Sequence, residues 1–225
     1  MIPTILLASN SPRRRQLLTL TGWTFLVQPV DIDEHPLAGE PPQDYVLRLA
    51  DSKARAAGRL AQPGQVVLAA DTTVADGNRI LGKPSDANDA RAMLGALRGR
   101  DHWVYTAIAA YQPAADKLVT DLCATRVWMR AYNDAEIDAY IASGDPFDKA
   151  GAYAIQNESF HPVERIDGCY ACVVGLAICR VVHILGAFDI APPNDVTSGC
   201  LSGLGDACSV FPEGFGGQGS AARKD

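Results

Sequence analysis

The sequence predicts an α/β protein, in which short apolar strands alternate with amphipathic helices. The apolar run "IPTILLA" at residues 2–8 leads directly into a helix-start pattern, "SNSPRRRQLL", at residues 9–18. Residues 66–70 are continuously apolar, which is typical of a strand buried on both faces. With 225 residues and 48% hydrophobic composition, the chain can bury the core of one large domain or of two small lobes.

The first third of the chain has clear start and stop signals. Ser11 is a good N-cap and Pro12 fits the first helical position, so we expect a helix from there to about Gly22. Residues 23–30 predict a second strand, and residues 43–61 an amphipathic helix. The apolar stripe of that helix consists of Val46, Leu49, Ala50, Ala54 and Ala57.

The middle of the chain continues the alternation. The tetrapeptide "ADGN" at residues 75–78 predicts a hairpin turn. A helix is expected over residues 85–99, with Asp86 near its cap and Gly99 as its stop, and strands over 104–111 and 118–130. Residues 133–144 predict a further helix, because Asn133 and Glu136 have the spacing of a capping box.

The last third predicts a strand over 149–156, a hairpin over 163–174 and a helix over 175–188. From residue 189 the composition shifts to Gly, Ser, Pro and Ala. We therefore expect one domain over residues 1–188 and a flexible tail over residues 189–225.

Charge and composition exclude several classes of protein. A net charge of −6 argues against a protein that coats nucleic acid or binds an anionic membrane. No apolar run reaches the roughly 18 residues that span a bilayer, and no basic segment precedes the first apolar stretch, so a cytoplasmic location is expected. Cys169 and Cys172 form a C-x-x-C motif, but it follows a predicted turn and does not open a helix. Reduced thiols are favoured over a redox or zinc site.

Two charged residues interrupt apolar patterns. Lys53 lies on the apolar stripe of its helix, where it either extends to the solvent at the helix edge or points into a cleft and meets an anion. Asp71 ends the apolar run 66–70, where it either caps a turn or belongs to a paired or metal-binding site. In open α/β sheets, ligands bind beyond the ends of the strands.

Other charged residues lie at the ends of predicted elements. Arg13 and Arg14 occupy the first turn of a helix, where the helix dipole disfavours cations. Lys83 lies in the rigid loop "LGKP", and Glu34 closes the acidic run "DIDE". Several cations around a helix N-terminus suit a polyphosphate, and carboxylates nearby suit Mg²⁺ or Mn²⁺. The Walker pattern is absent, so the chemistry predicted is phosphoanhydride handling without a Walker loop.

The order of several blocks resembles the Maf family, which comprises nucleoside triphosphate pyrophosphatases once described as septum-formation inhibitors. The blocks are "LASNSPRRRQLL", "VDIDE", "RLADSKARA", "AADTTVADGNRILGKP", "RGRDHWVYTA" and "DKAGAYAIQ…IDGCYACVVGL", over residues 4–185. The resemblance implies a curved mixed sheet with flanking helices that form two lobes around a cleft, as in inosine triphosphate pyrophosphatases. It also implies a metal-dependent hydrolysis of a nucleoside triphosphate to a monophosphate and pyrophosphate.

The resemblance assigns roles residue by residue. Asp71 is implied to be the catalytic carboxylate and, with Glu34, to bind a divalent cation, Mg²⁺ or Mn²⁺. The residues implied to bind the phosphates are Ser9, Arg13, Arg14, Lys53 and Lys83. Arg13, Thr72 and Gln156 are the implied specificity positions. The amide of Gln156 suits a pyrimidine, since it offers a donor and an acceptor to uracil or thymine.

The blocks "ADTTV" and "DKAGAYAIQ" resemble the branch that hydrolyses dTTP and UTP, with modified pyrimidine nucleotides as further substrates. The alternatives are a 7-methyl-GTP pyrophosphatase on the same fold, and a regulator of cell division that binds nucleotide without turnover. The sequence departs from the family pattern at Asn157, where Gly is usual and which adjoins the implied specificity position Gln156, and at Ala177. The expected partner is the nucleotide substrate, with no nucleic acid polymer and no membrane, and a homodimer is a family-level expectation.

Overall fold

The structure is a computed structural model, and it describes residues 4–196. The chain forms, in order, β1 (Ile5–Leu7), α1 (Pro12–Thr19), β2 (Phe25–Val27), α2 (Pro42–Gly58), β3 (Val66–Asp76), β4 (Arg79–Leu81), α3 (Ala87–Leu97), β5 (Asp101–Gln112), η1 (Pro113–Ala115), β6 (Lys117–Met129), α4 (Asp134–Ala142), η2 (Asp145–Asp148), η3 (Ala150–Ala152), β7 (Val163–Asp167), α5 (Tyr170–Val174) and α6 (Ile178–Gly186).

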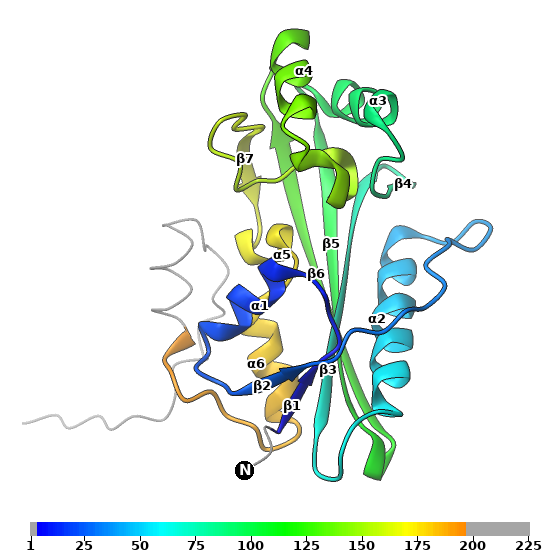
Figure 1. The fold of residues 1–225 in the computed structure, drawn as a ribbon, viewed down its shortest axis with the longest axis vertical. Helices are drawn as coiled ribbons and strands as arrows, with labels where there is room; N and C mark the ends of the chain where they lie inside the picture. Colours follow the sequence, from blue (N-terminus) through cyan, green and yellow to red (C-terminus); the bar gives the residue numbers. More distant parts are fainter. Residues whose placement is uncertain (1–3, 197–225) are drawn as a thin grey trace, which may run out of the picture.

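The strands form one mixed sheet in the order β2-β1-β3-β5-β6-β7, with β4 paired to the far end of β3. β1 is parallel to both of its neighbours, whereas β3, β5, β6 and β7 follow one another antiparallel. The long strands β3, β5 and β6 run the length of the molecule and hold its two ends together (Figure 1). The predicted α/β fold with a mixed sheet is confirmed.

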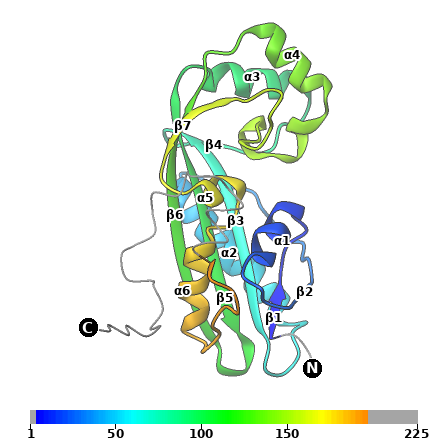
Figure 2. The same cartoon turned by 90° about the vertical axis from the view of Figure 1, so that its left-hand side faces the viewer.

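Helices cover the sheet in two separate lobes (Figures 1 and 2). In the larger lobe, α1, α5 and α6 lie on one face of the sheet, and α2 lies on the other. In the smaller lobe, α3 and α4 enclose a core built around Leu94, Val104, Met129 and Ile137. The same long strands thus contribute to both cores.

Local capping signals correctly predicted where three helices begin. The Ser11 side chain accepts a hydrogen bond from Arg14 N at the start of α1, and Asp86 caps α3. Asn133 and Glu136 form the predicted capping box of α4. α1 ends at Thr19, three residues before the predicted Gly22, which instead adopts a left-handed turn.

The strand predicted over residues 149–156 is wrong. Gly151 and Ala152 have positive φ values of 69° and 61°, which no strand accommodates. A side chain at Gly151 would bring its Cβ to 2.9 Å from a methyl of Val74, and the Gly151 N–H donates to the carbonyl of Gly82. Close packing against a distant strand and loop therefore imposes turns on this segment.

The hairpin predicted over residues 163–174 is wrong in its second half. β7 pairs with β6, but α5 follows at once, with Cys169 as its N-cap. The hydroxyl of Thr125 bonds both the N–H and the carbonyl of Cys169 and so holds the helix start against the sheet. The C-x-x-C motif therefore does open a helix, contrary to the prediction.

The thiols of that motif are nevertheless shielded. Cys169 is 3% exposed and Cys172 is fully buried. A hydrogen bond with Cys123, together with burial, raises the pKa of the Cys169 thiol. Reactive cysteines have lowered pKa values and solvent access, whereas Cys169 has neither property and Cys172 has no solvent access.

The chain continues beyond α6 along the larger lobe. Trp23 Nε1 donates to the carbonyl of Ala191, and Asn194 N donates to that of Thr21. Most of the predicted flexible tail, residues 197–225, lies outside the described residues. Within the described part, no helix has the length and apolar character needed to cross a membrane.

Candidate active site

A cleft of about 980 Å³ lies between the two lobes. It opens where the sheet has a gap on one edge of β3. β1 pairs with β3 as far as Leu68, and β4 begins to pair at Val74. Among the described residues, 69–73 have no strand partner on this edge, and of these Asp71, Thr72 and Thr73 line the cleft together with the residues that follow β1.

All the site residues expected from the sequence line this one cleft. They are Ser9, Arg13, Arg14, Glu34, Lys53, Asp71, Thr72, Lys83 and Gln156. They come from separate segments: the end of β1, the first turn of α1, the loop before α2, α2 itself, β3, the loop after β4 and the turn after η3. The fold therefore brings together residues far apart in the sequence.

Lys53 links the two carboxylates of the cleft. The neighbours of Lys53 on the α2 stripe are buried, and its own side chain is only 11% exposed. Its Nζ lies 2.6 Å from Asp71 Oδ1 and 2.6 Å from Glu34 Oε1. Lys53 therefore does not extend to the solvent at the helix edge. Its side chain points into the cleft, which was the other predicted position.

Asp71 does not end its strand. It lies in the middle of β3, opposite Ala107 of β5, because antiparallel pairing with β5 continues β3 to Asp76. The pairing of β1 with β3 stops at Leu68, and beyond that point Asp71 faces the cleft. Its alternative role as a turn cap is therefore wrong.

The side chain of Glu34 is 52% exposed, more than that of its ion-pair partner Lys53. Partial burial opposes ionisation of Glu34, but the hydrogen bond and charge of Lys53, with the charge of Lys83, lower its pKa overall. Tyr45 O–H donates to the backbone carbonyl of Glu34 and fixes this loop against α2. The carboxylate is ionised at neutral pH.

Arg14 is held among neutral oxygens. Its Nε donates to the carbonyl of Gly175 at 2.9 Å, its Nη2 to Thr72 Oγ1 at 3.1 Å and its Nη1 to Ser9 Oγ at 3.5 Å. Burial lowers the pKa of Arg14, while the charge of Asp71 opposes this effect. Arg14 thus brings a positive charge to the helix N-terminus without a carboxylate hydrogen-bonded to it among the described residues.

Arg13 instead crosses the cleft. Its Nη1 lies 3.1 Å from Asp148 Oδ2 in η2, which belongs to the smaller lobe. Asp148 also accepts a hydrogen bond from Lys149, whose side chain is 10% exposed. Asp148, Lys149 and Tyr45 also line the cleft, although they were not predicted from the sequence. Two signals could have indicated them. Tyr45 is spaced from Lys53 so as to lie on the same side of the helix, and "DK" stands in the same sequence block as Gln156.

The departures from the family pattern lie away from the cleft lining. Asn157 follows Gln156, but its side chain turns toward Asp145 and Phe160. Ala177 is fully buried at the start of α6. Asn157 is therefore connected to the cleft through the turn that carries Gln156.

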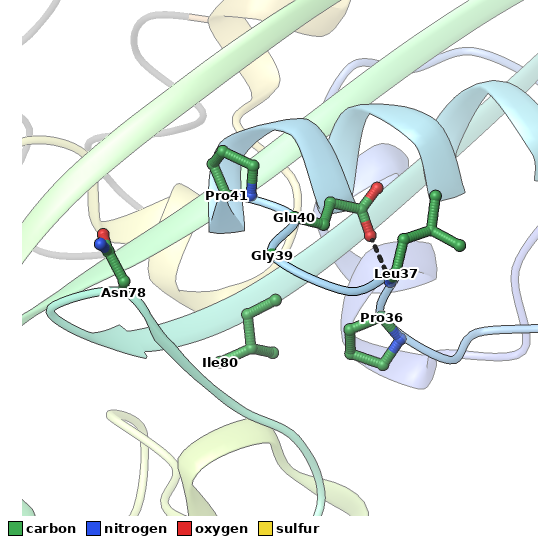
Figure 3. A pocket seen from close by; sticks show the side chains of 7 residues that line it. All are labelled: Pro36, Leu37, Gly39, Glu40, Pro41, Asn78 and Ile80. Atoms are coloured by element: carbon green, nitrogen blue, oxygen red, sulfur yellow. Dashed lines mark hydrogen bonds between the residues drawn. The ribbon is translucent and has the colours of Figure 1, made fainter.

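A smaller hollow of about 450 Å³ adjoins the cleft (Figure 3). It lies between the loop before α2 and the hairpin of β3 and β4, and it shares Pro36 and Ile80 with the cleft. Its one ionisable side chain, Glu40, is bonded to Leu37 N and to Arg48. The hollow is an extension of the cleft mouth that both polar and apolar residues line.

The fold and the cleft define a two-lobed α/β protein in which cations surround a pair of carboxylates between the lobes. A sequence model of the Maf family, described as Maf-like protein, matches residues 4–188. The chain belongs to the Maf family.

Curated relatives are similar over most of their length. A protein of Citrifermentans bemidjiense is 50% identical over 181 residues, which cover 80% of this chain and 93% of the relative. A protein of Anaeromyxobacter dehalogenans is 48% identical over 187 residues (82% and 94%), and one of Gloeobacter violaceus is 45% identical over 185 residues (82% and 96%). Each of these relatives is named dTTP/UTP pyrophosphatase.

Among solved structures, the Ham1 protein of Staphylococcus aureus matches with a TM-score of 0.39 and 14% identity. The match covers 56% of this chain and 72% of that one. A similarity of this extent supports no argument about activity.

Proposed function

We propose that this protein hydrolyses dTTP and UTP, and modified pyrimidine triphosphates, to the monophosphate and pyrophosphate. The observation that carries the proposal is the convergence on one cleft of the nine residues that the family resemblance implies. The shared name of relatives at 45–50% identity supports the choice of substrate.

The cations of the cleft would bind the triphosphate. The N-terminus of α1 carries a partial positive charge, to which Arg13 and Arg14 add their own charges. Lys53 and Lys83 approach from α2 and from the loop after β4. A bound triphosphate would offset the repulsion that the arginines create at the helix start.

A divalent cation, Mg²⁺ or Mn²⁺, fits the remaining charges. Residues 4–196 contain no group of three or more His, Cys, Asp or Glu side chains placed to hold a metal ion by themselves. Mg²⁺ is commonly bound by one or two carboxylates together with substrate phosphates and water. Glu34 and Asp71 supply such a pair, because Lys53 takes only one oxygen of each. When bound, the cation would polarise the phosphate and lower the pKa of water.

Asp71 is the proposed proton acceptor. Its carboxylate is buried beside Lys53 and faces the cleft, where it can accept a proton from the attacking water. Water would attack the α-phosphorus, the bond from that phosphorus to the bridging oxygen would break, and pyrophosphate would leave. Lys53 and the arginines would stabilise the charge that develops on the phosphate oxygens.

Arg13, Thr72 and Gln156 are the proposed specificity residues. Thr72 Oγ1 accepts a hydrogen bond from Arg14 and lies 2.9 Å from Thr106 Oγ1, so it orients Arg14. Gln156 is exposed on the opposite lobe and can pair with the O4 and N3–H of uracil or thymine.

The experiment is a measurement of pyrophosphate release from a panel of nucleoside triphosphates with Mg²⁺ and with Mn²⁺. Preferential hydrolysis of dTTP and UTP is expected. A preference for 7-methyl-GTP would overturn the choice of substrate. Tight nucleotide binding without pyrophosphate release at micromolar enzyme would overturn the enzymatic function and favour a regulatory nucleotide-binding protein.

A cytoplasmic location, a homodimer and the absence of a nucleic acid partner stay predictions. Light scattering coupled to size-exclusion chromatography, with and without an oligonucleotide, tests the last two.

A further inference from the structure

Gln156 lies in a tight turn whose two ends are linked to the same carboxylate oxygen, one directly and one through a tyrosine hydroxyl. The turn is closed by a hydrogen bond from Asn157 N to the carbonyl of Ala154 at 3.1 Å. The Asn157 side chain donates from Nδ2 to Asp145 Oδ2 at 3.1 Å. At the other end, Ala154 N donates to the hydroxyl of Tyr140 at 3.0 Å, and that hydroxyl donates to Asp145 Oδ2 at 2.7 Å.

The carboxylate itself is firmly held. Lys149 Nζ donates to Asp145 Oδ1 at 2.9 Å and to the Asp145 carbonyl at 2.6 Å. Partial burial opposes ionisation, but the bonds from Lys149 and Tyr140 lower the pKa of Asp145. An ionised Asp145 only accepts, so Tyr140 must donate to it and use its oxygen lone pair for Ala154 N.

The network also rests on the core of the smaller lobe. The Tyr140 ring is 4% exposed and stacks on Phe160, with ring centroids 4.3 Å apart. Phe160 N in turn donates to Asn157 Oδ1 at 2.8 Å. Both functional groups of the Asn157 side chain are therefore used, and the turn cannot shift without breaking several bonds.

A glutamine that reads a base needs such support. Its amide carries a donor and an acceptor and can rotate by half a turn, which exchanges the two. Uracil and cytosine present opposite donor and acceptor patterns at position 4. A fixed turn does not lock the amide itself, but it fixes the place from which the Gln156 side chain reaches the base, so the two amide orientations need not fit the base equally well.

We propose that Tyr140, Asp145 and Asn157 form a positioning network that holds the Gln156 turn and so sets pyrimidine discrimination. The inference rests on the proposed function, since it needs a base to be read at Gln156. None of the three residues lines the cleft. They act through the turn, and the hydrogen bonds of Arg13 and Arg14 go to other residues.

The test compares Tyr140→Phe with Tyr132→Phe. Each substitution removes one hydroxyl from a buried tyrosine of the smaller lobe, but Tyr132 donates to the Leu94 carbonyl, away from the turn. The readouts are the ratio of kcat/KM for UTP to that for CTP, and inhibition by inorganic tripolyphosphate. In Tyr140→Phe we expect the ratio to fall about 3- to 10-fold, the scale of one hydrogen bond, with tripolyphosphate inhibition within about twofold of wild type.

A second variant tests the network in case Tyr140→Phe does not fold. Asn157 is half-buried, so Asn157→Ala removes the direct bond to Asp145 with little effect on the core. It should lower the same ratio, and Asn157→Asp should lower it further, because a second carboxylate would face Asp145.

Two failures are distinguishable. If wild type releases pyrophosphate from no pyrimidine triphosphate, or from UTP and CTP equally, the proposed function fails. If wild type discriminates, and Tyr140→Phe and Asn157→Ala match Tyr132→Phe in the UTP to CTP ratio, the positioning network is wrong, whatever the change in melting temperature.

Discussion

The ammonium of Lys53 lies 2.6 Å from Asp71 Oδ1, and both side chains are about nine-tenths buried. The same ammonium lies 2.6 Å from the half-exposed Glu34. A buried charge is costly unless it is paired, so each of these residues makes the others acceptable at this position. Lys53 therefore has a structural role in addition to the proposed contact with phosphate.

Replacing Lys53 with Met should destabilise the protein. Removing one partner of a buried pair costs up to about 3–5 kcal/mol, reduced here because Glu34 and the cleft are open to solvent. The double variant Lys53→Met/Asp71→Asn should be more stable than Lys53→Met, since it removes both charges of the buried pair. Urea denaturation measures the free energy of unfolding of both variants.

Arg55→Met is the matched control, because Arg55 lies on the same helix and pairs with Asp51 on the surface. A loss of less than about 1 kcal/mol is expected for an exposed pair. Stability losses for Lys53→Met and Asp71→Asn that simply add in the double variant would show that the two side chains are not coupled.

Asp71→Asn should abolish catalysis while preserving the fold. The amide keeps the shape but cannot accept a proton from water, so kcat is expected to fall about 10²–10⁴-fold. Initial rates with dTTP measure the change, and circular dichroism checks that the variant is folded. A rate within twofold of wild type would show that Asp71 is not the base.

Local signals in the sequence predicted much of this site. Lys53 was identified because the stripe Val46, Leu49, Ala50 defines a face of α2, and burial of that face is a property of the helix itself. Ser11 was identified as a cap because capping depends on residues within one turn. Both predictions needed no knowledge of distant contacts.

The errors arose where distant contacts decide the conformation. The length of β3 beyond Asp71 depends on pairing with β5, which an apolar run does not reveal. The turns at Gly151 depend on Gly82 and Val74, which lie far from it in the sequence. The pair of Arg13 and Asp148 joins residues 135 positions apart, and no local pattern predicts it.

Glu34→Gln should weaken metal binding. A neutral amide is a poorer ligand for Mg²⁺ than a carboxylate, and it also reduces the negative charge beside Asp71. The Mg²⁺ concentration for half-maximal rate should rise about tenfold, a scale typical of changes around a metal site, with much of the rate recovered at saturation. An unchanged Mg²⁺ requirement would exclude Glu34 as a ligand.

Asp148→Asn should strengthen binding of pyrophosphate. The Asp148 carboxylate competes with phosphate for Arg13 and repels it, and its loss removes both effects. Since Asp148 is 62% exposed, the change in the inhibition constant should be modest, about 2- to 5-fold. The control is Asp134→Asn, which breaks an exposed pair with Arg98 away from the cleft and should leave inhibition unchanged. Weaker inhibition in Asp148→Asn would mean that Asp148 orients Arg13 for the phosphate.

His102 should make stability depend on pH below neutrality. It is 2% exposed, its Nε2 lies 2.8 Å from the Tyr153 hydroxyl, and its Nδ1 has no partner among residues 4–196. Burial lowers its pKa from 6.5 to about 4. Between these values the unfolded chain binds a proton that the folded chain does not, so stability is retained above pH 6.5 and lost as the pH falls toward 4.

The His102 contribution is isolated by comparing variants. The lowered pKa corresponds to about 3 kcal/mol across this window, so His102→Gln should flatten the curve of unfolding free energy against pH by an amount of that order. His161→Asn is the control, because His161 is exposed and its left-handed backbone, with φ of 44°, suits asparagine. Urea denaturation from pH 4.5 to 7.5 measures the slopes. Equal slopes for His102→Gln and wild type would show that other groups, chiefly carboxylates, account for the acid sensitivity.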